Sequence, residues 1–275
     1  MSVSPRVRVA QAAVAAVALA VAVGAEATVA KALSEGGRQR TVAGQSVLRP
    51  AAAEHLAADA VSRGAARAPL VRDVTQRKIL LGLPARLSPD GAGIDVGYAD
   101  APVTLTLFED FRCSETARFE AAQGAGLANL AARHTVLLRY VLESSLDQRL
   151  PGPGALLATN AARAALSHGG FPEYHALLFA NQPDELDNGF TEPRLLQLAS
   201  SVPKLRGAAF DAEVHRLWYR DWVDQAQSAY AAAQVHHGTP SMLLNGQEVD
   251  LGAQPQLLTD PAALNAFVQQ AAQSN

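Results

Sequence analysis

The sequence is poor in cysteine, since Cys113 is the only one among its 275 residues. A single cysteine excludes an intramolecular disulfide and comes close to excluding a structural zinc site. No histidine or cysteine group has metal-ligand spacing, so we expect neither a metal nor another cofactor. No basic stripe interleaved with aromatic residues is present either. Nucleic acid is therefore not expected as a partner.

Apolar residues are plentiful by comparison, at 49% of the chain. Many of them are alanine, which favours helix and adds little buried area per residue. The length is sufficient for one sizeable domain with extra segments, or for two small domains. The net charge of -3 is small.

The first 27 residues have the pattern of a targeting segment. Arg6 and Arg8 precede an apolar run, Ala12–Ala25, which ends in Ala25-Glu26-Ala27. This order is typical of a cleaved signal peptide. An uncleaved signal anchor is the alternative, because the run reaches about 17 residues when it is extended toward the N-terminus, the lower limit for a spanning helix. Either interpretation places the rest of the chain outside the cytoplasm, anchored in the membrane or secreted.

Residues 28–93 differ in composition, being rich in alanine, arginine and glycine. We expect a linker or stalk that is flexible or partly helical. Within it, the more apolar stretch from Arg72 to Leu83 is expected to supply an edge strand before the turn signals at Pro84 and Pro89-Asp90-Gly91.

A compact domain is expected over residues 94–275. Val103–Phe108 is β-branched and apolar, which predicts a buried strand. Ser114–Arg133 has apolar residues at helical spacing, and His134–Leu142 predicts a second strand. Strand, helix and strand of these lengths indicate a βαβ unit with a parallel pair.

A helical segment is expected over about 151–233, with helices at 155–167, 172–181, 192–200 and 208 to about 233. Two short strands then flank Asn245-Gly246, which is typical of a β-hairpin. Asp260-Pro261 begins a last helix, with aspartate as the N-cap and proline at the first helical position.

Cys113 follows the first predicted strand and precedes the first predicted helix of this domain. The positive end of a helix dipole favours a thiolate at such a position, which indicates a reactive thiol. Thr116 stands three residues further on, where a dithiol redox site has its second cysteine.

Three motifs in order resemble the DsbA-like branch of the thioredoxin-fold proteins, in particular its bacterial membrane-tethered members. They lie at residues 100–113 (Asp-Ala-Pro-Val-Thr, then Phe-Glu-Asp-Phe-Arg-Cys), 161–182 (Ala-Ala-Arg-Ala-Ala, then Tyr-His-Ala-Leu-Leu-Phe-Ala-Asn-Gln) and 238–246 (Gly-Thr-Pro-Ser, then Asn-Gly). The resemblance covers roughly residues 94–272. It implies an α/β, thioredoxin-like fold with a helical insertion between its βαβ and ββα halves.

The resemblance also implies roles for individual residues. Cys113 would be the nucleophile that attacks a substrate disulfide. Thr239-Pro240 would be a cis bond in a loop that faces Cys113 and pairs with substrate backbone. Ser114 stands where the family has proline, and Thr116 where it has the resolving cysteine. The dithiol activity is therefore not implied, and Thr116 is expected to stabilise the Cys113 thiolate through its hydroxyl.

Two functions are consistent with this pattern. The first is monothiol thiol-disulfide exchange through Cys113, with extracytoplasmic protein thiols or disulfides, or a low-molecular-weight thiol, as partners. The second is a redox-inactive binding or chaperone module for extracytoplasmic proteins, in which Cys113 is a buried small residue. A sulfur exposed beside Pro240 favours the first function, and a fully buried sulfur favours the second.

Charged residues near the cysteine leave further alternatives open. Glu109 or Asp110 would act in proton transfer beneath the thiol, or both are solvated at a strand end. Glu115 opposes a thiolate in the same turn, which Arg112 would offset. His168 and His175 of the helical segment are most simply surface or packing residues. One of the loop residues His236 and His237 would lie near Cys113 and assist thiolate formation, or both face water.

Overall fold

The computed structural model describes residues 74–274. The predicted targeting segment and most of the predicted linker lie outside these residues. No helix within the described part of the chain is both long enough and apolar enough to span a membrane.

From residue 103 onward, the described elements follow the predicted order of strand, helix and strand, then helices, then two strands and a last helix. In chain order they are α2 (Val74–Gly82), β1 (Ala85–Leu87), β2 (Ile94–Val96), β3 (Val103–Asp110), α3 (Ser114–Ala132), β4 (Val136–Glu143), η1 (Ser145–Gln148), α4 (Gly154–Ser167), α5 (Phe171–Ala180), α6 (Glu192–Ala199), α7 (Ala208–His215), α8 (Arg220–Ala233), β5 (Ser241–Leu244), β6 (Gln247–Glu248), α9 (Gln256–Thr259) and α10 (Pro261–Gln273).

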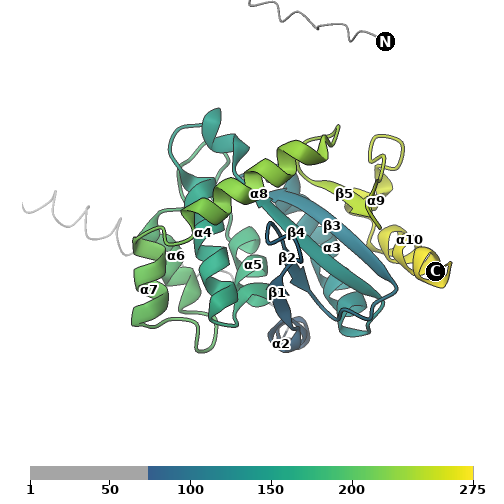
Figure 1. Ribbon diagram of the computed structural model, residues 1–275, viewed down its shortest axis with the longest axis horizontal. Coiled ribbons are helices and arrows are strands. Elements are labelled where there is room, and N and C mark those ends of the chain that lie inside the picture. Colours follow the sequence, from purple (N-terminus) through teal and green to yellow (C-terminus); the bar gives the residue numbers. More distant parts are fainter. Residues whose placement is uncertain (1–73, 275) are drawn as a thin grey trace, which may run out of the picture. The chain divides into compact units, whose positions relative to one another are not determined.

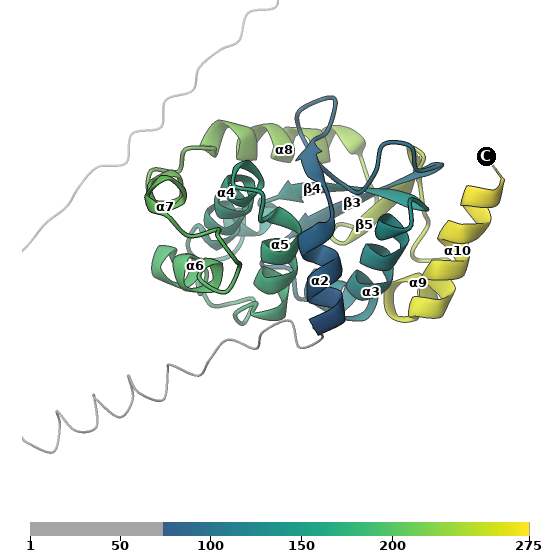
Figure 2. The same ribbon diagram turned by 90° about the horizontal axis from the view of Figure 1, so that it is seen from below.

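A six-stranded mixed sheet lies at the centre, in the order β1-β2-β4-β3-β5-β6 (Figure 1). β3 and β4 pair in parallel, as predicted, and every other neighbouring pair is antiparallel. Nearly all of β3 and β4 is buried, because helices cover both faces of the sheet. Figure 2 shows α8 on one face and α2 and α3 on the other.

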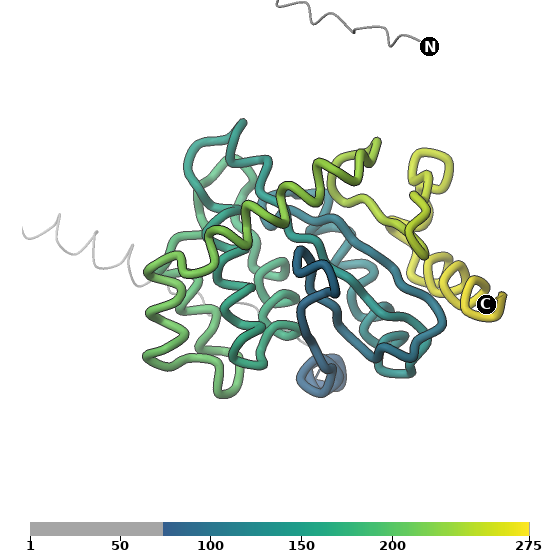
Figure 3. The backbone as a smooth tube through the Cα atoms, viewed as in Figure 1, coloured from purple at the N-terminus to yellow at the C-terminus, as the bar shows by residue number. Residues whose placement is uncertain are grey.

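The helical segment α4–α8 connects β4 to β5, where the sequence predicts an insertion (Figure 3). Small side chains let α4 pack closely against its neighbours, since Ala158, Ala161 and Ala165 are fully buried. The single helix predicted from residue 208 to about 233 is wrong. The chain breaks into α7 and α8 because Leu217 has a left-handed conformation (φ 49°), and Asn160 Oδ1 accepts a hydrogen bond from the Tyr219 N–H at 2.9 Å.

The N-terminal side of the domain also differs from the prediction. The stretch expected to form an edge strand is the helix α2, and the edge strand is β1. Leu80 and Leu83 join the core, and Arg77 Nε lies 2.6 Å from Glu173 Oε1 on α5. The folded region therefore extends to the N-terminal side of residue 94. A short apolar run does not distinguish helix from strand, which explains the error.

The C-terminal hairpin and helix form as predicted. Asn245 and Gly246 both have positive φ, at 49° and 82°, as a two-residue hairpin turn requires. Asp260 caps α10 by accepting a hydrogen bond from Ala262 N at 2.9 Å.

Replacing Arg139 tests how β2 is held against β4. Arg139 donates from Nε to Asp95 Oδ1 at 2.7 Å, and the Asp95 side chain is only 2% exposed. We expect Arg139→Ala to lower the free energy of unfolding by about 2 to 3 kcal/mol, because it leaves a buried carboxylate without its partner. Chemical denaturation would measure this. Arg118→Ala is the control, since its ion pair with Glu115 is exposed and is worth below about 0.5 kcal/mol; equal losses in the two variants would contradict the argument.

Candidate functional site

Cys113 is the N-cap residue of α3, in an extended conformation (φ -70°, ψ 117°). Its N–H donates to Asp110 O at 3.0 Å, and its carbonyl accepts from Ala117 N at 3.1 Å. The thiol is free and half-buried. The sequence pattern thus places the sulfur at the start of a helix, where backbone N–H groups are left without helical partners.

The loop before β5 brings a second segment to the sulfur. The Thr239-Pro240 peptide bond is cis. The Cys113 thiol donates a hydrogen bond to the Thr239 carbonyl, with Sγ 3.1 Å from the oxygen. Cys113 and Thr239, which are far apart in the chain, therefore meet where β3 ends and β5 begins.

Thr116 lies in the first turn of α3 and is fully buried. Its hydroxyl has no hydrogen-bond partner among the described residues. The Cys113 thiol donates its hydrogen bond to the Thr239 carbonyl and not to the Thr116 hydroxyl. A role for Thr116 beside a thiolate stays a prediction.

Arg112 and Glu115, whose charges are expected to affect a thiolate at Cys113, both form ion pairs with other residues. Arg112 is almost fully buried and donates to Asp147 Oδ1 at 2.9 Å, to Gly152 O at 3.0 Å and to Glu185 O at 3.2 Å. Glu115 is exposed and pairs with Arg118. Arg112 therefore ties the cysteine loop to the helical segment, and its charge is matched by Asp147.

Two further residues contact the cysteine loop, and sequence reasoning missed both. Gln182 Nε2 donates to Phe111 O at 2.8 Å and to Cys113 O at 2.9 Å. Glu185 Oε2 accepts from Ser114 N at 3.3 Å, which places a carboxylate at the N-terminus of α3. Gln182 ends a motif of the helical segment, but nothing in the sequence indicates how far its side chain reaches.

The carboxyl groups at the ends of β3 and β4 are buried rather than solvated. Asp110 and Glu143 are register partners on these parallel strands, and both are at most 1% exposed. Burial raises the pKa of each carboxyl, and the charge of Glu143 raises that of Asp110 further. Asp110 accepts hydrogen bonds from Arg112 N at 2.8 Å and Leu146 N at 3.1 Å. Asp110 and Glu143 are therefore buried, and a role of Asp110 in proton transfer beside the cysteine loop stays a prediction.

A pocket of about 410 Å³ lies beside the cis-proline. Its wall combines α3, the cis-proline loop and α9, through Phe119, Pro240, Pro255 and Leu258, with Glu115 and Arg118 as charged groups. An apolar wall of this size suits an apolar side chain of a ligand.

The Asp110–Glu143 pair predicts a pH dependence of stability. The folded pKa of Glu143 is raised, whereas the unfolded pKa of glutamate is about 4.3, so the folded chain binds more protons above that pH. Stability therefore falls as the pH rises through this window, by up to about 1.4 kcal/mol per pH unit. We expect Glu143→Gln to flatten the decline between pH 4.5 and the folded pKa, as followed by urea unfolding. Glu115→Gln, at an exposed position, is the charge-matched control. An unchanged slope in Glu143→Gln would contradict the assignment.

Comparisons with known proteins agree with the fold described above. A thioredoxin family model matches residues 90–260. No curated protein sequence matches the chain. Among solved structures, it is similar to the reduced disulfide bond oxidoreductase DsbG of Mycobacterium tuberculosis, at 22% identity and a TM-score of 0.56 over 71% of this chain and 91% of that one.

Two other solved structures show the same likeness. MdbA of Actinomyces oris, a thiol-disulfide oxidoreductase, has 26% identity and a TM-score of 0.54 over 65% of this chain and 85% of that one. Oxidised BdbD of Bacillus subtilis has 18% identity and a TM-score of 0.56 over 70% of this chain and 98% of that one. The fold is therefore thioredoxin-like, in the form that DsbA-like oxidoreductases share.

Proposed function

This chain belongs to the thioredoxin family, and on that premise we propose that it carries out monothiol thiol-disulfide exchange through Cys113. The observation that carries the proposal is the placement of a half-buried, free sulfur at the start of α3, 3.1 Å from the carbonyl of Thr239 beside cis-Pro240. A relic cysteine packed as a small apolar residue would instead be fully enclosed.

The exchange step follows from the chemistry of one thiol. The Cys113 thiolate attacks one sulfur of a partner's disulfide, that disulfide breaks, and the second sulfur of the partner leaves as a thiolate. The product is a mixed disulfide between Cys113 and the partner. Because the sequence has no second cysteine, an external thiol or the partner's own second thiol must attack the partner's sulfur in this mixed disulfide, which forms a new disulfide on the partner and releases Cys113 as a thiolate. The chain thus exchanges or isomerises disulfides and does not donate one of its own.

Substrate binding is proposed for Thr239 and Pro240 together with the pocket beside them. The loop flanks the sulfur, and the pocket next to Pro240 offers Phe119 and Leu258 to an apolar side chain. An extended polypeptide lying across the loop would present its disulfide to Cys113. The partners would be extracytoplasmic protein thiols or disulfides, with a low-molecular-weight thiol as the releasing reagent.

The extracytoplasmic location rests on the N-terminal sequence. Arg6 and Arg8 before the apolar run Ala12–Ala25 support export, with the segment either cleaved or retained as a membrane tether. A location outside the cytoplasm suits this chemistry, since disulfides persist in oxidising compartments.

A redox-inactive binding module is the second candidate, and one contact favours it. Glu185 already occupies the Ser114 N–H at the N-terminus of α3, so a thiolate at Cys113 would share that helix end with a carboxylate. In this case the pocket beside Pro240 would bind partners without covalent chemistry.

Oxidised glutathione separates the two candidates. We expect intact mass spectrometry of the purified chain at neutral pH to show one glutathione adduct, which dithiothreitol removes. Cys113→Ser is the control and gains no mass. The absence of an adduct on the folded chain, when the urea-unfolded chain forms one, would rule out the exchange function.

Replacing Thr116 by cysteine tests whether the site lacks only a resolving thiol. We expect oxidised Thr116→Cys to form a disulfide between positions 113 and 116, so that it resists alkylation and shows no stable glutathione adduct. Ala117→Cys is the control, because the neighbouring position should leave the Cys113 adduct in place. The proposal is contradicted if Thr116→Cys retains both a free thiol and a stable adduct at Cys113.

A further inference from the structure

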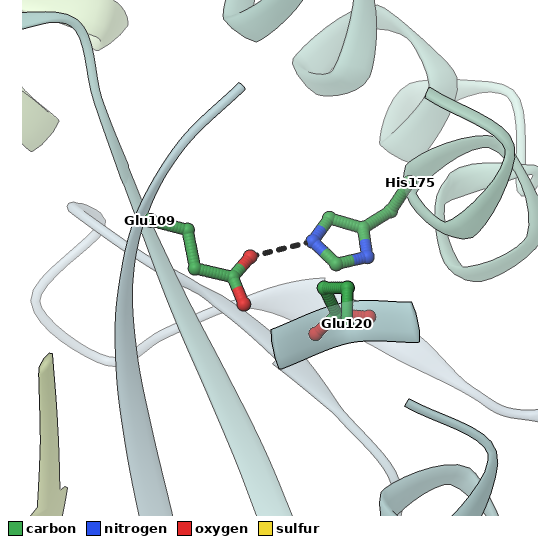
Figure 4. Close-up of side chains that lie close together, drawn as sticks. All are labelled: Glu109, Glu120 and His175. Atoms are coloured by element: carbon green, nitrogen blue, oxygen red, sulfur yellow. Dashed lines mark hydrogen bonds and ion pairs between the residues drawn. The ribbon is translucent and has the colours of Figure 1, made fainter. Parts of the chain in front are cut away.

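Three ionisable side chains meet behind the cysteine loop, on β3, α3 and α5. Glu109, Glu120 and His175 each offer one donor atom, and these atoms all lie within 4.8 Å of one another. Figure 4 shows the three side chains pointing toward a common centre from separate elements. The three residues have no metal-ligand spacing in the sequence, because they are far apart in the chain.

Glu109 and His175 are buried and Glu120 is half-buried, and part of the hydrogen-bonding capacity of the two carboxyl groups is unused. His175 Nε2 lies 2.7 Å from Glu109 Oε2, and both side chains are at most 3% exposed. Glu109 Oε1 and Glu120 Oε1 are covered and have no hydrogen-bond partner among the described residues. Within those residues, neither glutamate forms an ion pair with a lysine or arginine. The buried Glu109 and the half-buried Glu120 thus have no lysine or arginine as a partner among the described residues.

Burial shifts the pKa of each side chain in the cluster. Burial raises the pKa of Glu109 to about 8. Burial and the charge of Glu109 raise the pKa of Glu120 to about 8 as well. Burial lowers the pKa of His175, which keeps its imidazole neutral, the form that binds metals.

Gly124 provides room for the Glu120 carboxylate. A Cβ at residue 124 would lie 2.7 Å from Glu120 Oε2, the end of a flexible side chain, so the carboxylate would have to move from its present position. Glycine inside a helix is unfavourable relative to alanine. The helix nevertheless has glycine at the position where a larger residue would displace this carboxylate. Gly126, in the same helix, has nothing near its missing side chain.

A cavity of about 280 Å³ adjoins the cluster, with Glu120 and His175 in its wall. Apolar residues of α2, α3 and α5 make up most of the lining, including Leu80, Ala121 and Phe179. This space would accommodate a water or another small ligand next to the two side chains.

We propose that Glu109, Glu120 and His175 bind a divalent transition-metal ion, zinc in the first place. Two carboxylates balance the charge of the ion, and imidazole favours zinc and its neighbours over magnesium and calcium, which prefer all-oxygen sites. Three protein ligands leave a fourth position open toward the cavity. Zinc bonds of about 2.0 to 2.2 Å would draw the three side chains closer together by small rotations.

The proposed site is separate from the thiol. Glu120 follows Cys113 by two turns of α3, roughly 10 Å along the helix axis, so the sulfur is not a ligand. Glu109 and Glu120 flank the cysteine loop on either side. A bound ion would therefore fasten β3 and α3 to α5 around this loop, and its presence does not depend on whether Cys113 reacts.

Zinc binding to the full-length Cys113→Ser chain tests the proposal without interference from the thiol. We expect one Zn²⁺ per chain in competition with a chromophoric chelator. Glu120→Gln and His175→Ala should each weaken binding at least tenfold. His215→Ala is the matched control, because His215 forms an exposed pair with Glu192 and should leave binding unchanged.

Two glycine variants leave all three proposed ligands in place. They therefore test zinc binding even if replacing a ligand destabilises the fold. Gly124→Ala should weaken zinc binding at least tenfold, whereas Gly126→Ala in the same helix should not change it. Co²⁺ bound to the chain with Cys113 intact should show no sulfur-to-cobalt charge-transfer band. The proposal fails if the Cys113→Ser chain binds no stoichiometric zinc, or if Glu120→Gln and Gly124→Ala bind it as tightly as their controls. Either outcome would indicate two carboxyl groups that share protons.

Discussion

The pairing of β3 with β5 determines where Cys113 meets the Thr239-Pro240 loop. The strands are antiparallel, with Phe108 opposite Ser241, so the C-terminal end of β3 lies beside the start of β5. Cys113 follows β3 shortly after Phe108, and Pro240 immediately precedes Ser241. This register is what brings Sγ to 3.1 Å from the Thr239 carbonyl. A slip by one residue would turn every side chain of β5 to the other face and separate the two segments.

The helical segment holds the resulting site in place. Arg112 links the cysteine loop to Asp147, and Asp147 in turn accepts hydrogen bonds from Ala155 N at 3.0 Å and Leu156 N at 2.8 Å at the start of α4. Gln182 bonds to the carbonyls on either side of Arg112. The insertion therefore supports the cysteine loop from one side, while the Thr239-Pro240 loop approaches it from the other.

Local patterns account for the parts of the fold that were predicted correctly. The β-branched stretch of β3, the helical spacing in α3, the Asn-Gly turn and the Asp-Pro helix start are each readable within a few residues. Tertiary contacts decided the rest. The helix α2 packs on α3 and α5, and the break at Leu217 coincides with a hydrogen bond to the distant Asn160.

In the candidate site, too, short sequence motifs indicate some residues, and tertiary contacts determine the others. Cys113 and the Thr239-Pro240 loop were recognisable from short motifs, but the contacts of Gln182 and Glu185 depend on how the helical segment folds back. Glu109 and Asp110 were equally compatible with a solvated strand end. Only the covering helices show that both are buried, and that Glu109 lies beside His175.

The most direct test of the central claim is the alkylation rate of Cys113 by iodoacetamide across the pH range, in the native chain and in the same chain unfolded in urea. A working thiol beside the cis-proline should react in the native state at neutral pH at least as fast as in the unfolded state. Protection of more than tenfold in the native state at every pH would contradict this account, and would leave the chain as a thioredoxin-fold protein without thiol chemistry.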